Sequence, residues 1–120
     1  MTVAVVGSRG YSMLGDVIEA VAALPPGTTV VSGGARGVDR TAWETATKSM
    51  HLRTEVISPD YAKHGPKLAP LIRNREIAER CDRMIAFWNP PSGGTANAIA
   101  WAVALGKPVE VHLAPDGSGE

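Results

Sequence analysis

The sequence of 120 residues contains a single cysteine, Cys81, so no disulfide bond can form within the chain. A protein without disulfides is typical of a reducing compartment, and we therefore expect it to be cytoplasmic. Its longest apolar run, residues 98–105, is far shorter than the roughly 20 residues that cross a bilayer. The first residues enter an apolar stretch without the basic segment of a secretion signal. We expect neither a membrane partner nor secretion.

The sequence also lacks any excess of charge, because 12 lysines and arginines balance 12 aspartates and glutamates. Proteins that hold duplex DNA carry a basic surface, so this composition argues against a nucleic-acid partner. A chain without net charge could still carry a local basic patch. The three histidines, His51, His64 and His112, show no metal-ligand spacing. We expect no metal and no cofactor.

Short apolar runs alternate with alanine-rich stretches of helical periodicity along residues 1–113. They predict strands at residues 3–6, 29–32, 55–58, 84–88 and 109–113, and helices at residues 14–22, 38–50, 70–81 and 95–105. This alternation predicts one α/β domain, a Rossmann-like three-layer sandwich whose five-stranded parallel sheet has the order 3-2-1-4-5. Residues 114–120 have too little apolar surface to pack, and we expect a flexible tail there.

Three glycine-containing segments follow the first, second and fourth predicted strands: VVGSRG, VVSGGARG and PPSGGT. In the predicted sheet they meet at one edge, where the strand order reverses and a crevice opens. Glycine lets the backbone approach a ligand closely, and the start of a helix attracts anions. One such segment could serve a turn alone, but three at one edge favour a phosphate-bearing ligand.

Two polar residues of the third predicted helix, Arg73 and Asn74, fall on the stripe that should be apolar, in a turn at the same sheet edge. Arg73 could contact a ligand, or it could form an ion pair with Asp39 or Asp60. Arg36 and Asp39 could bind phosphate and ribose hydroxyls, or they could lie on a solvated surface. No catalytic residue is identified, unless Arg73 is one. The predicted ligand-binding residues are Gly7, Ser8, Arg9, Gly33, Gly34, Arg36, Gly37, Asp39, Arg73, Asn74, Ser92, Gly93, Gly94 and Thr95.

Four segments resemble, in content and in order, the YspA-like family of the SLOG superfamily: GSRG, VVSGGARGVDRTA, IRNREIAERCDRMIAFWNPPSGGT and GKPV. This superfamily also includes the LOG-type phosphoribohydrolases and the DNA-processing protein DprA. The resemblance implies a Rossmann-like fold that binds nucleotides or nucleotide derivatives, in many members as a dimer. It also implies a role as a sensor or effector in prokaryotic or phage conflict systems.

One position departs from the LOG-type enzymes, which carry the motif P-G-G-x-G-T-x-x-E. Its glutamate assists cleavage of the base–ribose bond. When Gly94 and Thr95 are aligned with the G-T of that motif, Ala98 occupies the place of the glutamate. The resemblance therefore implies a phosphate-binding site but no phosphoribohydrolase activity.

Three functional hypotheses follow. The leading one is a cytoplasmic module that binds a nucleotide or nucleotide derivative, as a sensor or by sequestering it. The first alternative is a nucleotide N-glycosidase that uses Arg73 with either Asp39 or Glu76. The second alternative is a DprA-like protein that binds single-stranded DNA. The helix at residues 95–105 is apolar around more of its circumference than one sheet face requires, which predicts a homodimer with Trp43 or Trp101 at the contact.

Overall fold

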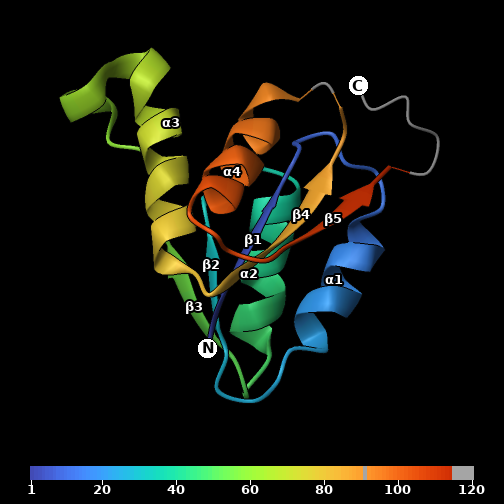
Figure 1. The fold of residues 1–120 in the computed structure, drawn as a ribbon. Coiled ribbons are helices and arrows are strands. Elements are labelled where there is room, and N and C mark those ends of the chain that lie inside the picture. The colour runs from blue at the N-terminus through green and yellow to red at the C-terminus, as the bar shows by residue number, and fades with distance from the viewer. Residues whose placement is uncertain (91, 115–120) are drawn as a thin grey trace.

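Five parallel strands form one sheet in the order β3-β2-β1-β4-β5, which confirms the predicted fold class and strand order (Figure 1). The computed structural model describes residues 1–90 and 92–114. The strands are β1 (Thr2–Gly7), β2 (Thr29–Ser32), β3 (Arg53–Val56), β4 (Arg83–Trp88) and β5 (Val109–Leu113). The helices are α1 (Leu14–Ala22), α2 (Val38–Lys48), α3 (Tyr61–Arg80) and α4 (Gly93–Ala104).

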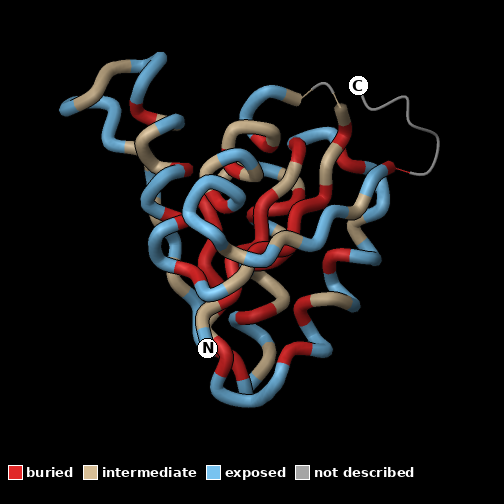
Figure 2. Tube along the Cα trace, viewed as in Figure 1, coloured by how far each residue is buried: buried red, intermediate tan, exposed pale blue. Residues whose placement is uncertain are grey.

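The helices cover the two faces of the sheet in pairs, because the central strands are apolar on both sides. Val3 and Val5 of β1 belong to the core that α1 and α2 close. Ala4 and Val6 belong to the core on the other face, which α3 and α4 close. Figure 2 shows the buried residues gathered along the central strands, with the outer helix surfaces exposed. No helix in the described part of the chain is long and apolar enough to span a membrane.

The third strand and the third helix differ from the prediction. β3 begins at Arg53 and not at residue 55, because this edge strand has no buried apolar run that could fix its position. The predicted loop at residues 59–69 is wrong, since α3 already begins at Tyr61. Asp60 caps it by accepting a hydrogen bond from the Lys63 amide at 3.1 Å, and Gly65, at φ 81°, divides it into two helical parts.

The predicted tail at residues 114–120 begins one residue too early. Ala114, assigned to the tail, is instead buried against the core that α1 and α2 close. The rest of the predicted tail, residues 115–120, lies outside the described residues. The winding reverses between β1 and β4, so a crevice is expected at their carboxyl ends.

Candidate ligand-binding site

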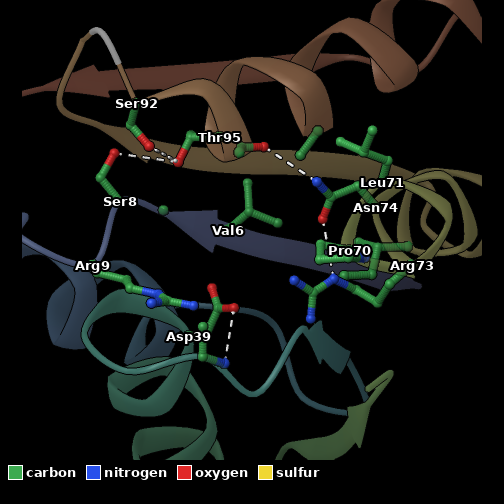
Figure 3. Close-up of a pocket in the computed structure, with 15 residues that line it drawn as sticks. Val6, Ser8, Arg9, Asp39, Pro70, Leu71, Arg73, Asn74, Ser92 and Thr95 are labelled. Atoms are coloured by element: carbon green, nitrogen blue, oxygen red, sulfur yellow. Dashed lines mark hydrogen bonds between the residues drawn. The ribbon is translucent and has the colours of Figure 1, made fainter. Parts of the chain in front are cut away.

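A cavity of about 300 Å³ lies at the carboxyl ends of β1 and β4, where the sheet changes winding direction. Its volume is at the lower end of the range found for small-molecule sites, about 300–1,000 Å³. Figure 3 shows side chains from both faces of the sheet pointing toward it. This first cavity is lined by Val6, Gly7, Ser8, Arg9, Ala35, Asp39, Pro70, Leu71, Arg73, Asn74, Ile77, Ser92, Gly94, Thr95 and Ala98.

A second cavity of about 330 Å³ adjoins the first, on the side of β2 and β3. Arg9, Ala35 and Arg73 line both, so the two cavities form one cleft, the name used below for the pair. The second cavity is lined by Arg9, Gly33, Gly34, Ala35, Arg36, Ser58, Pro59, Tyr61 and Arg73.

The cleft brings together twelve of the fourteen ligand-binding residues predicted from the sequence. Gly37 and Gly93 line neither cavity. Gly37 is instead required by the backbone, because its φ is +80° and a Cβ atom there would lie 2.6 Å from the carbonyl oxygen of Arg9. This glycine therefore allows the loops after β1 and β2 to touch.

Three hydroxyl groups meet where α4 begins. The Oγ of Ser8 lies 3.2 Å from the Oγ1 of Thr95 and accepts a hydrogen bond from the Asn89 amide at 2.9 Å. The Oγ of Ser92 lies 3.4 Å from the same Thr95 hydroxyl. Ser92 precedes α4 but makes no side-chain cap, so the first amide groups of the helix are left for an anion.

Arg73 and Asn74 connect the two walls of the cleft by hydrogen bonds. Arg73 donates from Nη1 to the Gly33 carbonyl at 2.6 Å and from Nε to the Asn74 Oδ1 at 3.1 Å. Asn74 in turn donates to the Gly94 carbonyl at 3.2 Å and to the Asn97 Oδ1 at 3.1 Å. A continuous chain of hydrogen bonds thus runs from the end of β2 to the first turn of α4.

The ion pair considered for Arg73 does not form in the described part of the chain. Neither Asp39 nor Asp60 has a carboxylate oxygen within 4.0 Å of its guanidinium nitrogens. Backbone and amide oxygens hold the guanidinium instead, and its Nη2 has no partner among residues 1–90 and 92–114. A donor of Arg73 is therefore left for a ligand.

Asp39 is a buried carboxylic acid beside this arginine, with 6% of its surface exposed. Its Oδ2 accepts a hydrogen bond from the Ala35 amide at 3.3 Å, whereas Oδ1 has no partner among the described residues. Burial raises the pKa of Asp39 from 3.8 to about 6, against the opposing effects of the Ala35 amide and of Arg73. This carboxyl group therefore changes charge close to neutral pH.

Tyr61 is the aromatic residue of the cleft, and it was not predicted from the sequence. Half of its surface is exposed (52%), and it lines the second cavity together with Arg36. The sequence held a signal for it: an aromatic residue just after Pro59 and Asp60, at the same sheet edge as the glycine segments. It was overlooked because this segment contains no glycine cluster.

Acid–base chemistry in the cleft would depend on a single carboxyl group. Asp39 is the one carboxylate that lines it among the described residues. Glu76 is exposed on a separate groove with Glu55 and Glu79, so the structure does not bring Arg73 and Glu76 together at the cleft. Ala98, at the place of the glutamate in the LOG-type motif, lines the first cavity with its methyl group.

Comparisons with known proteins give matches of two kinds. Residues 1–70 match the family described as DNA recombination-mediator protein A. The chain is also 34% identical over 116 residues to the Gene 61 protein of Mycobacterium phage D29, covering 89% of this chain and 92% of the phage protein.

Two solved structures share the fold. DNA processing protein A from Helicobacter pylori, which binds single-stranded DNA, superimposes with a TM-score of 0.73 at 23% identity. DprA from Streptococcus pneumoniae superimposes with a TM-score of 0.79 at 24% identity. Each match covers 92% of this chain, but only 64% and 49%, respectively, of the longer neighbour.

Proposed function

Because the chain belongs to the DNA recombination-mediator protein A family, we propose that its cleft binds single-stranded DNA by a backbone phosphate. The fold shared with the H. pylori protein, which binds single-stranded DNA, supports this choice of ligand. The proposal places the protein in the cytoplasm, where its single cysteine stays reduced.

The observation that carries the proposal is the charge of the cleft. Three arginines, Arg9, Arg36 and Arg73, line it, whereas Asp39 is its one carboxylate among the described residues. A chain without net charge thus has a locally positive site. The amide groups at the start of α4 lie at the same cavity and favour an anion. Nucleic-acid affinity depends on such contacts with phosphate.

Tyr61 adds a surface on which a base can stack. Its exposed ring lies at the second cavity beside Arg36, one residue after Asp60. Stacking of a base on an aromatic ring stabilises complexes with single strands by roughly 1–3 kcal/mol per base and is tolerant of sequence. The second cavity adjoins the first, so a strand held by a phosphate in the first cavity can extend toward this ring. We therefore expect binding with little sequence preference.

A second candidate function is the binding of a free nucleotide or nucleotide derivative. The small size of the first cavity, about 300 Å³, favours it, since a single phosphate-bearing unit fits such a volume. Both candidates use the same phosphate contacts. Neither includes turnover: Ala98 carries no group that transfers a proton, and Asp39 is the one carboxylate that lines the cleft among the described residues.

The proposal is tested by the salt dependence of DNA binding. We expect a fluorescently labelled oligothymidine to bind, with an affinity that falls as salt concentration rises. Arg9→Ala and Arg36→Ala should each weaken binding several-fold and reduce the slope of log affinity against log salt by about 0.7. Arg40→Ala is the matched control, because Arg40 lies outside the cleft and pairs with Glu44 at 3.4 Å.

Two results would contradict the proposal. One is the absence of binding to any single-stranded oligonucleotide while a mononucleotide binds, which would establish the second candidate. The other is an equal loss of affinity in Arg40→Ala, which would place the contact outside the cleft.

The role of the α4 start is tested by Gly94→Val. A Cβ atom at Gly94 would meet no atom within 4 Å, so the fold should tolerate the substitution. Because Gly94 lines the first cavity, an added side chain would take up space at the helix start. We expect DNA binding to weaken about tenfold, roughly 1.4 kcal/mol, with an unchanged midpoint of thermal unfolding. Anisotropy titration and calorimetry measure the two quantities. Unaltered affinity would show that phosphate is not held at this helix start.

A further inference from the structure

The two edge strands of the sheet differ in how they face solvent. The β3 edge carries charged side chains, Arg53 and Glu55, and Glu55 pairs with Arg80 at 2.7 Å. On β5, the residues on the α4 side of the sheet are all apolar: Val109, Val111 and Leu113. Val111 and Leu113 are 43% and 57% exposed. Proteins protect free edges with charge, but on β5 the polar residues Glu110 and His112 are confined to the other side, so the α4 side of this edge is unprotected.

The backbone of β5 also presents hydrogen-bonding groups outward. The Met84 amide of β4 donates to the Pro108 carbonyl at 2.9 Å. In a parallel pair, alternate residues bond to the neighbouring strand, so Glu110 and His112 direct their backbone groups to β4. The backbone groups of Val109, Val111 and Leu113 therefore point away from the sheet. No described strand pairs with them.

We propose that this edge binds a second copy of the chain, through antiparallel pairing of the two β5 strands about a two-fold axis at Val111. In this register Val111 lies opposite itself, and Val109 lies opposite Leu113 of the second copy. All three residues have outward backbone groups, so each pair forms hydrogen bonds. The two sheets become one continuous sheet.

The charge of Glu110 selects this register. Glu110 and His112 lie side by side on the α1 face, in contact through His112 Nε2 and Glu110 Oε2. When the pairing is centred on Val111, each Glu110 lies opposite His112 of the second copy. A carboxylate then faces an imidazole on both sides of the axis. Centring the pairing on Glu110 would place two carboxylates opposite each other, and like charges directly opposite are destabilising.

Helix α4 extends the apolar surface beside β5. Trp101 faces α3, where the Arg75 guanidinium lies 5.1 Å from its ring centroid, and Ala102 is buried against the sheet. Each residue of a helix is rotated by about 100° from the one before it, so the next residue, Val103, lies on the β5 side of α4. Val103 is 63% exposed. The second copy would cover this side chain with β5. The proposed contact therefore differs from the one predicted from sequence, because Trp101 packs against α3 and not at β5.

The test is the oligomeric state at micromolar concentration, measured by sedimentation and light scattering. We expect the unmodified chain to be a dimer and Val111→Arg to be a monomer, because the axis brings two like charges together. Val56→Arg is the matched control: Val56 ends β3, the other edge, and is 40% exposed. It should remain a dimer. A monomeric unmodified chain, or a dimeric Val111→Arg, would overturn the proposal.

Two further experiments test the register and do not depend on Val111→Arg folding. Val111→Asp and Val111→Lys should each be monomeric alone and form a dimer when mixed. Val111→Cys should form a disulfide-linked dimer on oxidation, since the Cα separation of such a pair is about 5.5 Å and within the bridging range. Val56→Cys should not, and Cys81 is buried. Failure of both the mixture and the disulfide would exclude the register. None of these results depends on DNA binding, so this proposal and the proposed function can fail separately.

Discussion

Replacing Arg73 with alanine is expected to weaken binding of single-stranded DNA by about 100-fold, or roughly 2.7 kcal/mol. Arg73 lines both cavities, and its Nη2 has no partner among the described residues. Its orientation is fixed before the ligand arrives by the Gly33 carbonyl at 2.6 Å. A phosphate would therefore meet a charged donor that is already in place. Anisotropy titration at constant salt measures the loss.

The effect of Arg73→Ala on the stability of the fold has to be separated from the loss of its contact with phosphate. Arg73→Ala also removes the cation nearest to Asp39, so the buried carboxylate becomes less stable when ionised. Adding Asp39→Asn in the same chain should recover stability toward urea but not DNA binding. Recovery of both would show that Arg73 acts only through the fold, and the proposed contact would then be wrong.

The titration of Asp39 should lower the free energy of unfolding of the protein as pH rises from 4 to 7. The pKa of Asp39 is about 6 in the folded protein, against 3.8 as its ordinary value. Between these values the folded state holds the proton more often than the unfolded state, so the free energy of unfolding decreases with increasing pH. A difference of about 2 pH units corresponds to roughly 3 kcal/mol.

The contribution of Asp39 is isolated by comparison with Asp39→Asn. The difference in free energy of unfolding between the two proteins is measured with urea. It should favour the unmodified chain most below pH 4, and this advantage should shrink by roughly 3 kcal/mol by pH 7. Other titrating groups are common to both proteins and cancel. A difference that does not vary with pH would show that the burial of Asp39 does not raise its pKa.

DNA binding should respond to the same group. Protonation of Asp39 removes the one carboxylate charge that lines the cleft among the described residues. Backbone phosphates do not titrate in this range, so the affinity of the unmodified protein for oligothymidine should rise as pH falls through 6. Asp39→Asn should bind with an affinity that changes less over the same range.

The fold could be predicted because its central strands carry their own signal. Residues 3–6 and 84–88 are apolar without interruption, as strands buried on both faces must be, and β2 and β5 were placed at their observed bounds. β3 could not be placed as well, because an exposed edge strand lacks that pattern. The start of α3 was missed because Pro70 suggested a later beginning, whereas Pro70 lies inside the helix.

The convergence of the site could also be predicted, since the order of a parallel sheet fixes which loops share an edge. Its internal contacts could not. The partner of Arg73 is a backbone carbonyl, Gly33, which no pattern of side chains reveals. The raised pKa of Asp39 depends on burial that arises only when β1 and α2 pack. Ligand binding by the selected residues stays a prediction.

Four motifs in the sequence led to the prediction of a superfamily that includes DprA, and this part of the prediction is confirmed. The chain belongs to the family of DNA recombination-mediator protein A, whereas membership of the YspA-like group stays a prediction. The comparisons favour the second alternative, single-stranded DNA, over the free nucleotide. Net charge does not describe the site, because it averages over surfaces that a ligand never meets, while Arg9, Arg36 and Arg73 gather at one cleft.

The hydrogen-bonded chain from Gly33 through Arg73 and Asn74 to Gly94 has a kinetic consequence. It ties the loop after β2 to the first turn of α4 without help from a ligand, so the walls cannot separate unless these bonds break. An arriving strand need not wait for a loop to close, and its association rate should be set by diffusion and attraction to the arginines. Differences in affinity among oligonucleotides should then appear almost entirely in how long each stays bound.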